Sequence, residues 1–562
     1  MRDRRSFWQK QLSRRRMLKG LGRAGMGVMG LAAVGCAAAP AATPTRAPAA
    51  PGAATPTSRP AASPTPVAKQ LDRLVLGHNR DIVTLDPGLT SSTIPAMGAL
   101  QMMYDGLTVH DRKSQAVPSL ATSWENPDQL TWLFKLRPGV KFHNGYDFEA
   151  ADVKFTIERM IDPQTKSPLV TLVRNVDKVE AVDQGAVKIV TKVVEPAFLR
   201  MIPDVFIISQ KYLKESDPAI MQNKPVGTGP YRFVKWTKDD ALELTALENH
   251  FRIGKPPSRT FFQRVIPSDT PRMAALTTGE IEYAFGVPPE QWEQIEKDPN
   301  LGLLVDDWNL SFPHLGISQF GESPLRDKRV RLAINYAINR EEMAKGLFKG
   351  KVRPVGQPLS PACFGYDEAI KSYPYDPQKA KALLAEAGYP NGLEITFWIT
   401  PEASYLMQKE YNEATMGFLN AVGIKTNVKT VPVGQSSQFF ERMRGRNEGP
   451  EGIFHMAGMC GVFLDAFQLL ESHYVTFNEQ TGLGNKMYWS DSEIDAWAKE
   501  ARNILDEKKR KELYSKIFRK MNEEALTIPL FSMVYAWGYN KKKVKAIYPR
   551  QSRHAAWDIE VA

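Results

Sequence analysis

Strand-like and helix-like patterns alternate along the chain from about Leu71 onward, and this interleaving constrains the fold more than any other feature. Apolar and polar residues alternate from Thr131 to Leu136, as in a strand with one buried face. Asp376-Pro377 predicts a helix start, because Asp caps free N–H groups and Pro fits the first helical position. Strands interleaved with helices indicate a mixed α/β fold.

Three amphipathic patterns support this assignment, each with apolar residues at helical spacing on one face. Gly388 would end the first helix, and Asn339 with Glu342 resembles a capping box after the second. The apolar faces consist of Ala380, Leu383, Leu384 and Ala387 in the first helix, of Val330, Ile334, Ala337 and Ile338 in the second, and of Ile494, Trp497, Ala501, Ile504 and Leu505 in the third.

The composition excludes several classes of protein. With 562 residues the chain is long enough for several domains or lobes, and a 43% hydrophobic share argues against general disorder. No run of 18 or more apolar residues is present, so a helical membrane transporter is excluded. The net charge is +11, but residues 1–35 contribute +8, and the remaining +3 does not indicate a nucleic-acid partner.

Residues 1–35 predict an export signal. A basic run that includes Arg14–Arg16 precedes a short apolar stretch of small residues from Ala24 to Gly35. The basic run resembles a twin-arginine signal, although the general export route stays open. Leu31–Cys36 resembles a bacterial lipobox, in which Cys36 becomes the lipidated first residue of the mature protein. A plain cleavable signal with an incidental cysteine is the alternative.

Residues 36–70 predict a tether between this cysteine and the folded body. Positions 37–69 contain 13 Ala, 8 Pro, 5 Thr and 2 Ser, and no acidic or aromatic residue. Such a segment cannot bury a core, and its prolines favour an extended chain. We therefore expect an extracytoplasmic protein that is lipid-anchored to the outer face of the cytoplasmic membrane, or periplasmic; a spacer without an anchor is the alternative.

Contiguous catalytic motifs are absent from the sequence. It has no HExxH, GxSxG, P-loop or GxGxxG pattern, and its eight His are scattered without metal-ligand spacing. We therefore expect no enzyme activity, no cofactor and no metal, while two carboxylates that meet only in the folded chain stay an alternative. Cys363 and Cys460 form either a disulfide, as in many exported proteins, or two free thiols.

Ordered blocks of the sequence resemble the family 5 solute-binding proteins of ABC importers, whose members bind peptides or nickel. The most specific block is Leu130–Gly145, followed by Ala151–Thr156. The resemblance covers roughly residues 72–560. The other blocks are Leu85–Pro87, Tyr104–Leu107, Pro118–Glu125, Pro225–Tyr231, Asp327–Arg331, Ala337–Arg340 and Glu386–Gly392.

The resemblance implies a two-lobed periplasmic-binding-protein-like fold with a hinge and an extra inserted domain. By the order of the blocks, lobe I would comprise residues 72–113, 223–312 and 531–562. The inserted domain would comprise residues 114–222, and lobe II residues 313–530.

The resemblance also suggests a binding role for Asp465. In peptide-binding members an Asp of lobe II pairs with the α-ammonium of the ligand, because a buried ammonium needs a fixed counter-charge. The usual segment carries two acidic residues, but Met456–Asp465 carries only Asp465, which matches the second acidic position. This departure puts a peptide ligand in doubt. The alternative for Asp465 is the N-cap of a helix over Ala466–Leu470.

The remaining ligand candidates stand beside a turn or at strand ends. The predicted strands His314–Ser318 and Glu394–Ile399 would end at an interlobe crevice, where α/β proteins place ligand contacts. Core packing is the alternative for the aromatic candidates. The candidates are Tyr104, Gln319, Phe320, Trp398 and Thr400.

We therefore interpret the chain as a monomeric extracytoplasmic receptor of an ABC importer. It would bind a peptide or peptide-like solute between its lobes and deliver it to separate permease and ATPase subunits. An oligosaccharide, another organic solute or a metal complex is the alternative cargo. An exported hydrolase and an extracytoplasmic chaperone are the alternative functions.

Overall fold

A computed structural model describes residues 70–90, 94–217, 219–306, 311–400, 406–432, 452–459, 464–476, 488–549 and 558–562. All described residues belong to one compact unit, Thr65–Ala562. The predictions for the export signal, for nearly all of the tether and for the cysteines Cys36 and Cys460 lie outside the described residues.

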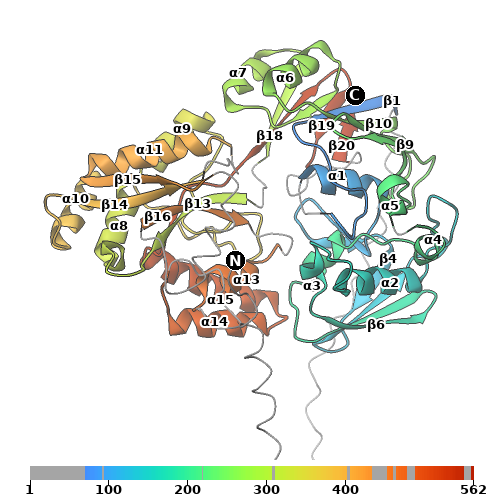
Figure 1. Cartoon of the computed structure of the whole chain (residues 1–562), viewed down its shortest axis with the longest axis horizontal. Coiled ribbons are helices and arrows are strands. Elements are labelled where there is room, and N and C mark those ends of the chain that lie inside the picture. The colour runs from blue at the N-terminus through green and yellow to red at the C-terminus, as the bar shows by residue number, and fades with distance from the viewer. Residues whose placement is uncertain are drawn as a thin grey trace, which may run out of the picture. The chain divides into compact units, whose positions relative to one another are not determined.

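The largest sheet has seven strands in the order β12-β18-β11-β1-β10-β9-β8. Figure 1 labels its strands β1, β9, β10 and β18. Its strand β1 is parallel to β10 and β11, and all other neighbours are antiparallel. β1 begins at Leu71, where the sequence predicts the folded body to begin. The strands are β1 (Leu71–His78), β8 (Tyr231–Thr237), β9 (Ala241–Ala246), β10 (Ser258–Val265), β11 (Tyr283–Phe285), β12 (Leu301–Asp306) and β18 (Tyr535–Asn540).

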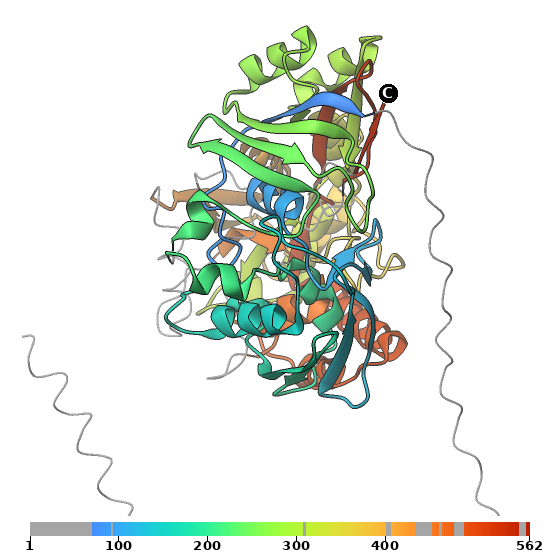
Figure 2. The same cartoon turned by 90° about the vertical axis from the view of Figure 1, so that its right-hand side faces the viewer.

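Helices pack on both faces of this sheet because β1 alternates its apolar side chains between them. Leu74 and Leu76 belong to a core that includes residues of α1 (Ile94–Met103), and Figure 2 shows this helix beside the green strands. Val75 belongs to the core that includes residues of α6 (Asp269–Thr278) and α7 (Pro289–Lys297). The hairpin of β19 (Val544–Ile547) and β20 (Ile559–Val561) adds to the first core.

A second sheet has four antiparallel strands in the order β4-β5-β7-β6. β5 spans Thr131–Leu136, as predicted, and buries Trp132, Phe134 and Leu136. Its other strands are β4 (Ala121–Glu125), β6 (Val176–Asp183) and β7 (Ala186–Thr191), and α2 (Ala150–Ile161) contributes to the same core. The shorter elements nearby in the chain are β2 (Thr108–His110), β3 (Ala116–Pro118), η2 (Val170–Leu172), α3 (Phe198–Met201), η3 (Ile202–Asp204), α4 (Gln210–Lys214) and α5 (Ile220–Asn223).

A third sheet has five strands in the order β15-β14-β16-β13-β17. Its strand β14 is parallel to β15 and β16, and β13 is antiparallel to β16 and β17. The predicted strands at 314–318 and 394–399 lie within β13 and β14. The strands are β13 (Ser311–Ser318), β14 (Leu393–Ile399), β15 (Ile424–Thr430), β16 (Gly452–Met459) and β17 (Thr527–Pro529).

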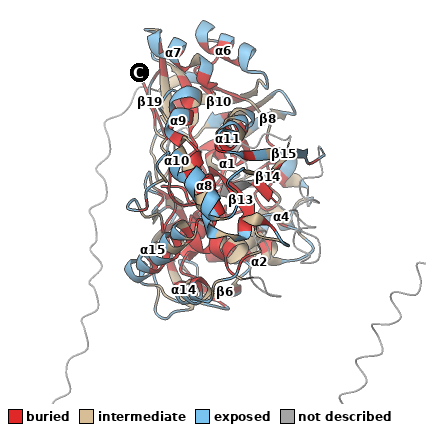
Figure 3. Ribbon diagram, turned by 90° about the vertical axis from the view of Figure 1, so that its left-hand side faces the viewer, coloured by how far each residue is buried: buried red, intermediate tan, exposed pale blue. Residues whose placement is uncertain are grey.

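Four helices share a core with this sheet, and Figure 3 shows their exposed outer sides and buried inner sides. Two of their starts follow the predicted signals, because the side chains of Asn339 and Asp376 cap them. The side chain of Asp327 caps a third helix, a cap that the sequence pattern did not predict. Gly388, with φ +94°, follows the end of the helix that Asp376 caps, as predicted. The helices are α8 (Lys328–Ala337), α9 (Arg340–Phe348), α10 (Pro377–Glu386) and α11 (Gln408–Ala421), and η4 (Pro324–Arg326) precedes them.

A group of C-terminal helices completes the fold: α13 (Ala466–Leu469), the π-turn η6 (Leu470–Tyr474), α14 (Ser492–Arg502) and α15 (Glu507–Glu523). The predicted third amphipathic helix is correct for Ile494 and Ala501 but wrong for Ile504 and Leu505, which lie beyond α14. The reason is a competing cap, because the side chain of Asp506 accepts bonds from two backbone N–H groups and starts α15.

The chain passes between the seven-stranded and five-stranded sheets twice, from β12 to β13 and from β17 to β18. The second passage, residues 530–534, is buried throughout. The other strands of the seven-stranded sheet, β1 and β8–β11, precede the first passage in the chain. The other strands of the five-stranded sheet, β14–β16, lie between the two passages. Two chain passages between two sheets provide the connectivity that a hinge requires.

Candidate functional site

Alternation along the strands divides the side chains of the five-stranded sheet between two faces. One face belongs to the core shared with α8, α9, α10 and α11, and the other belongs to a separate core. Trp398 lies on the second face, turned away from these helices. The first set is Leu315, Ile317, Ile395, Phe397 and Ile453, and the second is Phe312, Trp398 and Phe454.

Trp398 and Thr400 lie where the sequence places them, at the end of β14 and just after it. Trp398 is partly exposed, and the Lys429 ammonium of the neighbouring strand β15 lies 5.4 Å from its ring centre. Thr400 is also partly exposed, and its carbonyl oxygen accepts a bond of 3.4 Å from Gln408. A partly exposed indole can stack on a planar or apolar ligand group.

Gln319 and Phe320 directly follow β13. The Phe320 ring lies 4.8 Å from the ring of Tyr488. The Nε2 atom of Gln319 is buried and has no hydrogen-bond partner among the described residues. A buried amide donor without a partner costs free energy. A hydrogen bond from this amide to an acceptor such as a ligand carbonyl would therefore be favourable.

Tyr104 lies in a core and not at an open surface. Its side chain is 1% exposed, and its hydroxyl donates a 3.1 Å bond to the carbonyl oxygen of Leu85. Burial raises its pKa well above the ordinary value, and the charge of Asp86 adds to this shift. The packing alternative for Tyr104 is therefore confirmed, and its role toward a ligand stays an untested prediction.

Asp465 is the N-cap of α13, so the cap alternative is confirmed. Its Oδ1 accepts bonds from the backbone N–H of Phe467 at 3.1 Å and from the Tyr514 hydroxyl at 2.8 Å. Its Oδ2 lies 2.5 Å from Nη2 of Arg510 and 3.9 Å from Nη1 of Arg200. Asp465 is fully buried, and both of its oxygens already have partners. Its role toward a ligand is a prediction that the geometry does not favour.

Asp465 shifts the pKa values of the buried side chains around it. Burial raises the pKa of the Tyr514 hydroxyl well above its ordinary value, and the Asp465 carboxylate raises it further. Burial alone would lower the pKa of Arg510, but Asp465 and Tyr514 together raise it above its ordinary value. The cluster therefore keeps a neutral phenol beside a charged guanidinium.

A second buried carboxylate, Asp105, is surrounded in the same way. Its Oδ2 is 3.1 Å from both the Thr228 hydroxyl and Nε2 of His250, and its Oδ1 accepts from Arg252 at 3.3 Å and Ser119 at 3.4 Å. Burial alone would raise its pKa, but His250 and Arg252 lower the pKa of Asp105 to about 2. This cluster joins the Tyr104–Leu107 and Pro225–Tyr231 blocks, which gives both a structural role.

Sequence reasoning missed Arg200, Arg502 and Arg510, whose contacts turn out to be extensive. Arg510 is fully buried and stands at helical spacing with Leu513 and Tyr514 on the apolar face of α15. A cation inside an apolar pattern signals a buried charge that needs a partner, and this signal was available in the sequence. The partner residues are distant in the chain, so the sequence pattern did not identify them.

Cys363 is disulfide-bonded. The alternative of two free thiols is therefore wrong for this residue. The other two cysteines of the chain, Cys36 and Cys460, lie outside the described residues.

Two further observations concern the wider surface. A pocket of about 670 Å³ runs along β8 and includes none of the candidate residues. Among the described helices, none combines the length and apolar character needed to cross a membrane.

Comparison with known proteins places these features in a family. Residues 115–478 match the middle region of the bacterial extracellular solute-binding proteins, family 5. The glutathione-binding protein GsiB of Pectobacterium atrosepticum is 32% identical over 480 residues, which cover 84% of this chain and 91% of the relative.

Two solved structures share the fold. The substrate-binding protein CtaP of Listeria monocytogenes has a TM-score of 0.77 at 22% identity, with 88% of this chain and 100% of that chain covered. The periplasmic binding protein DppA of Helicobacter pylori, in complex with the peptide STSA, has a TM-score of 0.67 at 26% identity over 88% of this chain and 98% of that chain. The predicted two-lobed binding-protein fold is therefore confirmed. The chain belongs to the family 5 extracellular solute-binding proteins of ABC importers.

Proposed function

We propose that this protein is a hinge-closing, lipid-anchored receptor that delivers a peptide-like solute, with glutathione as its reference ligand, to an ABC permease. The observation that carries the proposal is the similarity to a glutathione-binding protein over 91% of that relative's length. A relative crystallised with a four-residue peptide, STSA, supports the same class of solute. The proposed receptor is monomeric and has no catalytic step.

The proposed lobes follow the sheets. Every strand of the seven-stranded sheet comes from 72–113, 223–312 or 531–562 within one residue, which supports assigning these segments to lobe I. The four-stranded sheet lies entirely within the proposed inserted domain, residues 114–222. The strands of the five-stranded sheet lie within 311–529, which supports lobe II at residues 313–530 with its hinge at the two passages.

The proposed solute contacts are Trp398, Thr400, Gln319 and Phe320. A peptide offers carbonyl groups to the Nε2 donor of Gln319, which has no partner among the described residues, and side chains to the partly exposed ring of Trp398. Asp465 is not included, because its carboxylate is already bonded on both oxygens. The solute's ammonium, if it is buried, therefore needs another counter-charge.

Calorimetric titration tests the solute class. Glutathione and tri-alanine are compared with maltose on wild-type protein and on Trp398→Ala, with Trp132→Phe, a buried position of β5 in the four-stranded sheet, as the aromatic control. We expect saturable binding of a peptide, weakened in Trp398→Ala and retained in Trp132→Phe. The peptide should also be recovered unaltered by mass spectrometry. Binding of maltose with no response to either peptide would overturn the peptide class, and a chemically altered peptide would overturn the receptor without turnover.

The anchor has a separate test. Cys36→Ala should remove the lipid and release the protein from the membrane fraction, whereas Gly35→Ala keeps a small residue before the cysteine and should stay anchored. Equal membrane fractionation of Cys36→Ala and wild type would contradict the anchor.

A further inference from the structure

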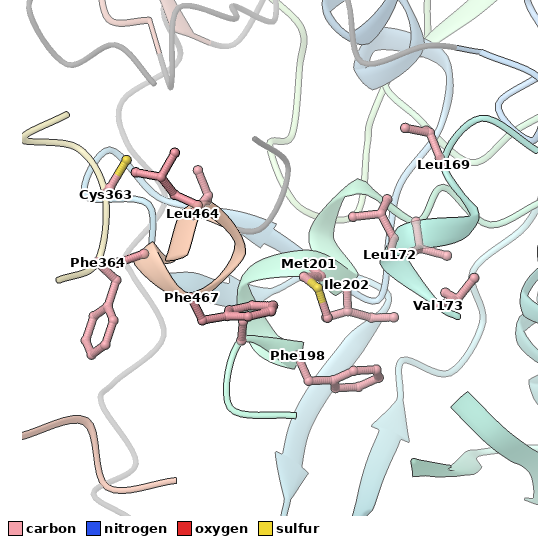
Figure 4. Packing of buried hydrophobic residues seen from close by; sticks show 14 of the residues in the cluster. Leu169, Leu172, Val173, Phe198, Met201, Ile202, Cys363, Phe364, Leu464 and Phe467 are labelled. Atoms are coloured by element: carbon pink, nitrogen blue, oxygen red, sulfur yellow. The ribbon is translucent and has the colours of Figure 1, made fainter. Parts of the chain in front are cut away.

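Two segments that are far apart in the chain form one buried contact. Phe198, Met201 and Ile202, after the four-stranded sheet, belong to the same apolar cluster as Phe364 and Phe467 of the C-terminal half. Figure 4 shows Phe467 of α13 next to Met201 of α3. We call this contact the seam, with Glu195, Phe198, Arg200 and Met201 on one side and Phe364, Asp465, Phe467, Glu471, Arg502 and Glu507 on the other.

Arg502 forms one ionic junction of the seam. Its Nη2 lies 3.0 Å from Oε2 of Glu195, and its Nη1 donates to Oε1 of Glu195 at 3.1 Å and to the Val194 carbonyl oxygen at 2.8 Å. Its Nε lies 3.1 Å from Oε1 of Glu471 on its own side. The Glu195 side chain is 1% exposed, so this two-pronged pair is largely withdrawn from water.

Arg200, on the side of the seam opposite to Arg502, forms a second ionic junction. Its guanidinium is ion-paired with Glu507 and lies 3.9 Å from the Asp465 carboxylate. The same guanidinium lies 4.0 Å from the ring centre of Phe364. One cation therefore reaches across the seam from each side, and the side chain of Arg200 is only 7% exposed.

Protein groups alone complete these junctions. Each cation of the seam has a carboxylate partner, and the burial of Arg200 and Glu195 strengthens the attraction. Both junctions join residues 194–200, in the proposed inserted domain, to residues of the proposed lobe II. No solute group is needed to satisfy any of these charges.

We propose that the seam is a latch that holds the inserted domain against lobe II and favours the closed receptor before solute binds. The proposal rests on the proposed hinge-closing function and adds a device that sets the fraction of closed molecules. Because the apparent affinity scales with the population of the binding-competent state, weakening the latch weakens solute binding without touching the solute site.

Hydroxyl-radical footprinting of the full chain without added solute tests the latch. Met201 is 1% exposed at the seam, whereas Met160 of α2 and Met343 of α9, each 3% exposed, are not among the residues that define the seam. Arg200→Gln is the main variant, because Asp465 keeps Arg510 and Glu507 is already half exposed. Glu195→Gln weakens the other junction, and Arg329→Gln removes an exposed pair inside lobe II as the control.

We expect slow oxidation of Met201 in the wild type and in Arg329→Gln, and several-fold faster oxidation in both seam variants, with Met160 and Met343 unchanged throughout. Faster oxidation of all three methionines in one variant marks unfolding, and the other seam variant then decides. Equal Met201 oxidation in wild type and a folded seam variant would overturn the latch. Glutathione titration is a second readout, but the oxidation result stands whether or not glutathione binds, so failure of the proposed solute class remains distinguishable.

Discussion

Asp105 and Asp465 are two buried carboxylates whose partners come from different parts of the chain. Each accepts several hydrogen bonds and faces at least one arginine. The partners of Asp105 are Ser119, Thr228, His250 and Arg252, all in the N-terminal half of the chain. Asp465 has Arg510 and Tyr514 nearby in the chain, but also Arg200 from a segment more than 250 residues away.

This difference separates stability of the fold from stability of a conformation. A cation in the same folded unit is lost only when that unit unfolds, so its attraction adds to the free energy of unfolding. A cation from the proposed inserted domain is lost when that domain and lobe II part, so its attraction adds mainly to closure. Variants that remove each partner separately therefore measure the contribution to the free energy of unfolding and the contribution to closure one at a time.

The largest effect is expected for Asp465→Asn. Arg510 is fully buried, so loss of the carboxylate leaves an uncompensated charge and should lower the free energy of unfolding by about 3–5 kcal/mol. Urea denaturation measures this loss. Asp327→Asn is the matched control, since Asp327 is also a helix N-cap with an arginine partner but is partly exposed, and should cost only about 1 kcal/mol. Equal losses would contradict the role given to burial.

Asp105→Asn should have an intermediate effect that depends on pH. The pKa of Asp105 falls from the ordinary 3.8 to about 2 in the folded protein. A lowered pKa stabilises the fold fully above the ordinary value, and this stabilisation is lost as the pH falls through the folded value. The difference corresponds to about 2 kcal/mol at neutral pH.

The measurement is the melting temperature of wild type and Asp105→Asn between pH 7 and pH 2. The gap between the two should be constant above about pH 5 and should narrow as the pH falls from about 4 toward 2. A gap in melting temperature that widens on acidification would show that the pKa of Asp105 is not lowered in the folded protein.

The smallest effect on stability is expected for Arg200→Gln. Asp465 keeps Arg510, and Glu507 is half exposed, so the free energy of unfolding should fall by no more than about 1 kcal/mol. The same variant should open the seam, as footprinting of Met201 would report. A loss as large as that of Asp465→Asn would show that Arg200 belongs to the fold and not to closure.

The sequence predicted features that depend on neighbours in the chain. β5 and α10 follow from alternation, from the Asp376 cap and from the Gly388 stop, and the Asp465 cap was one of two stated alternatives. The helix through Ile504 and Leu505 was wrong, because the pattern continued past a stronger cap signal at Asp506.

The contacts that define the seam were not predictable in the same way. Arg200 and Asp465, or Glu195 and Arg502, meet only because two distant segments pack together, and no local period encodes such a pairing. The candidates at strand ends were placed correctly along the chain. Which face Trp398 occupies follows from its register with Phe454, which the sequence alone did not supply.

The central claim, a receptor for a peptide-like solute, is tested most directly by native mass spectrometry of protein purified without added solute. A co-purified molecule would be released and fragmented in the same instrument. The account predicts fragments with amino-acid residue masses, as from glutathione or a short peptide. A released sugar or metal complex without amino-acid fragments would contradict it.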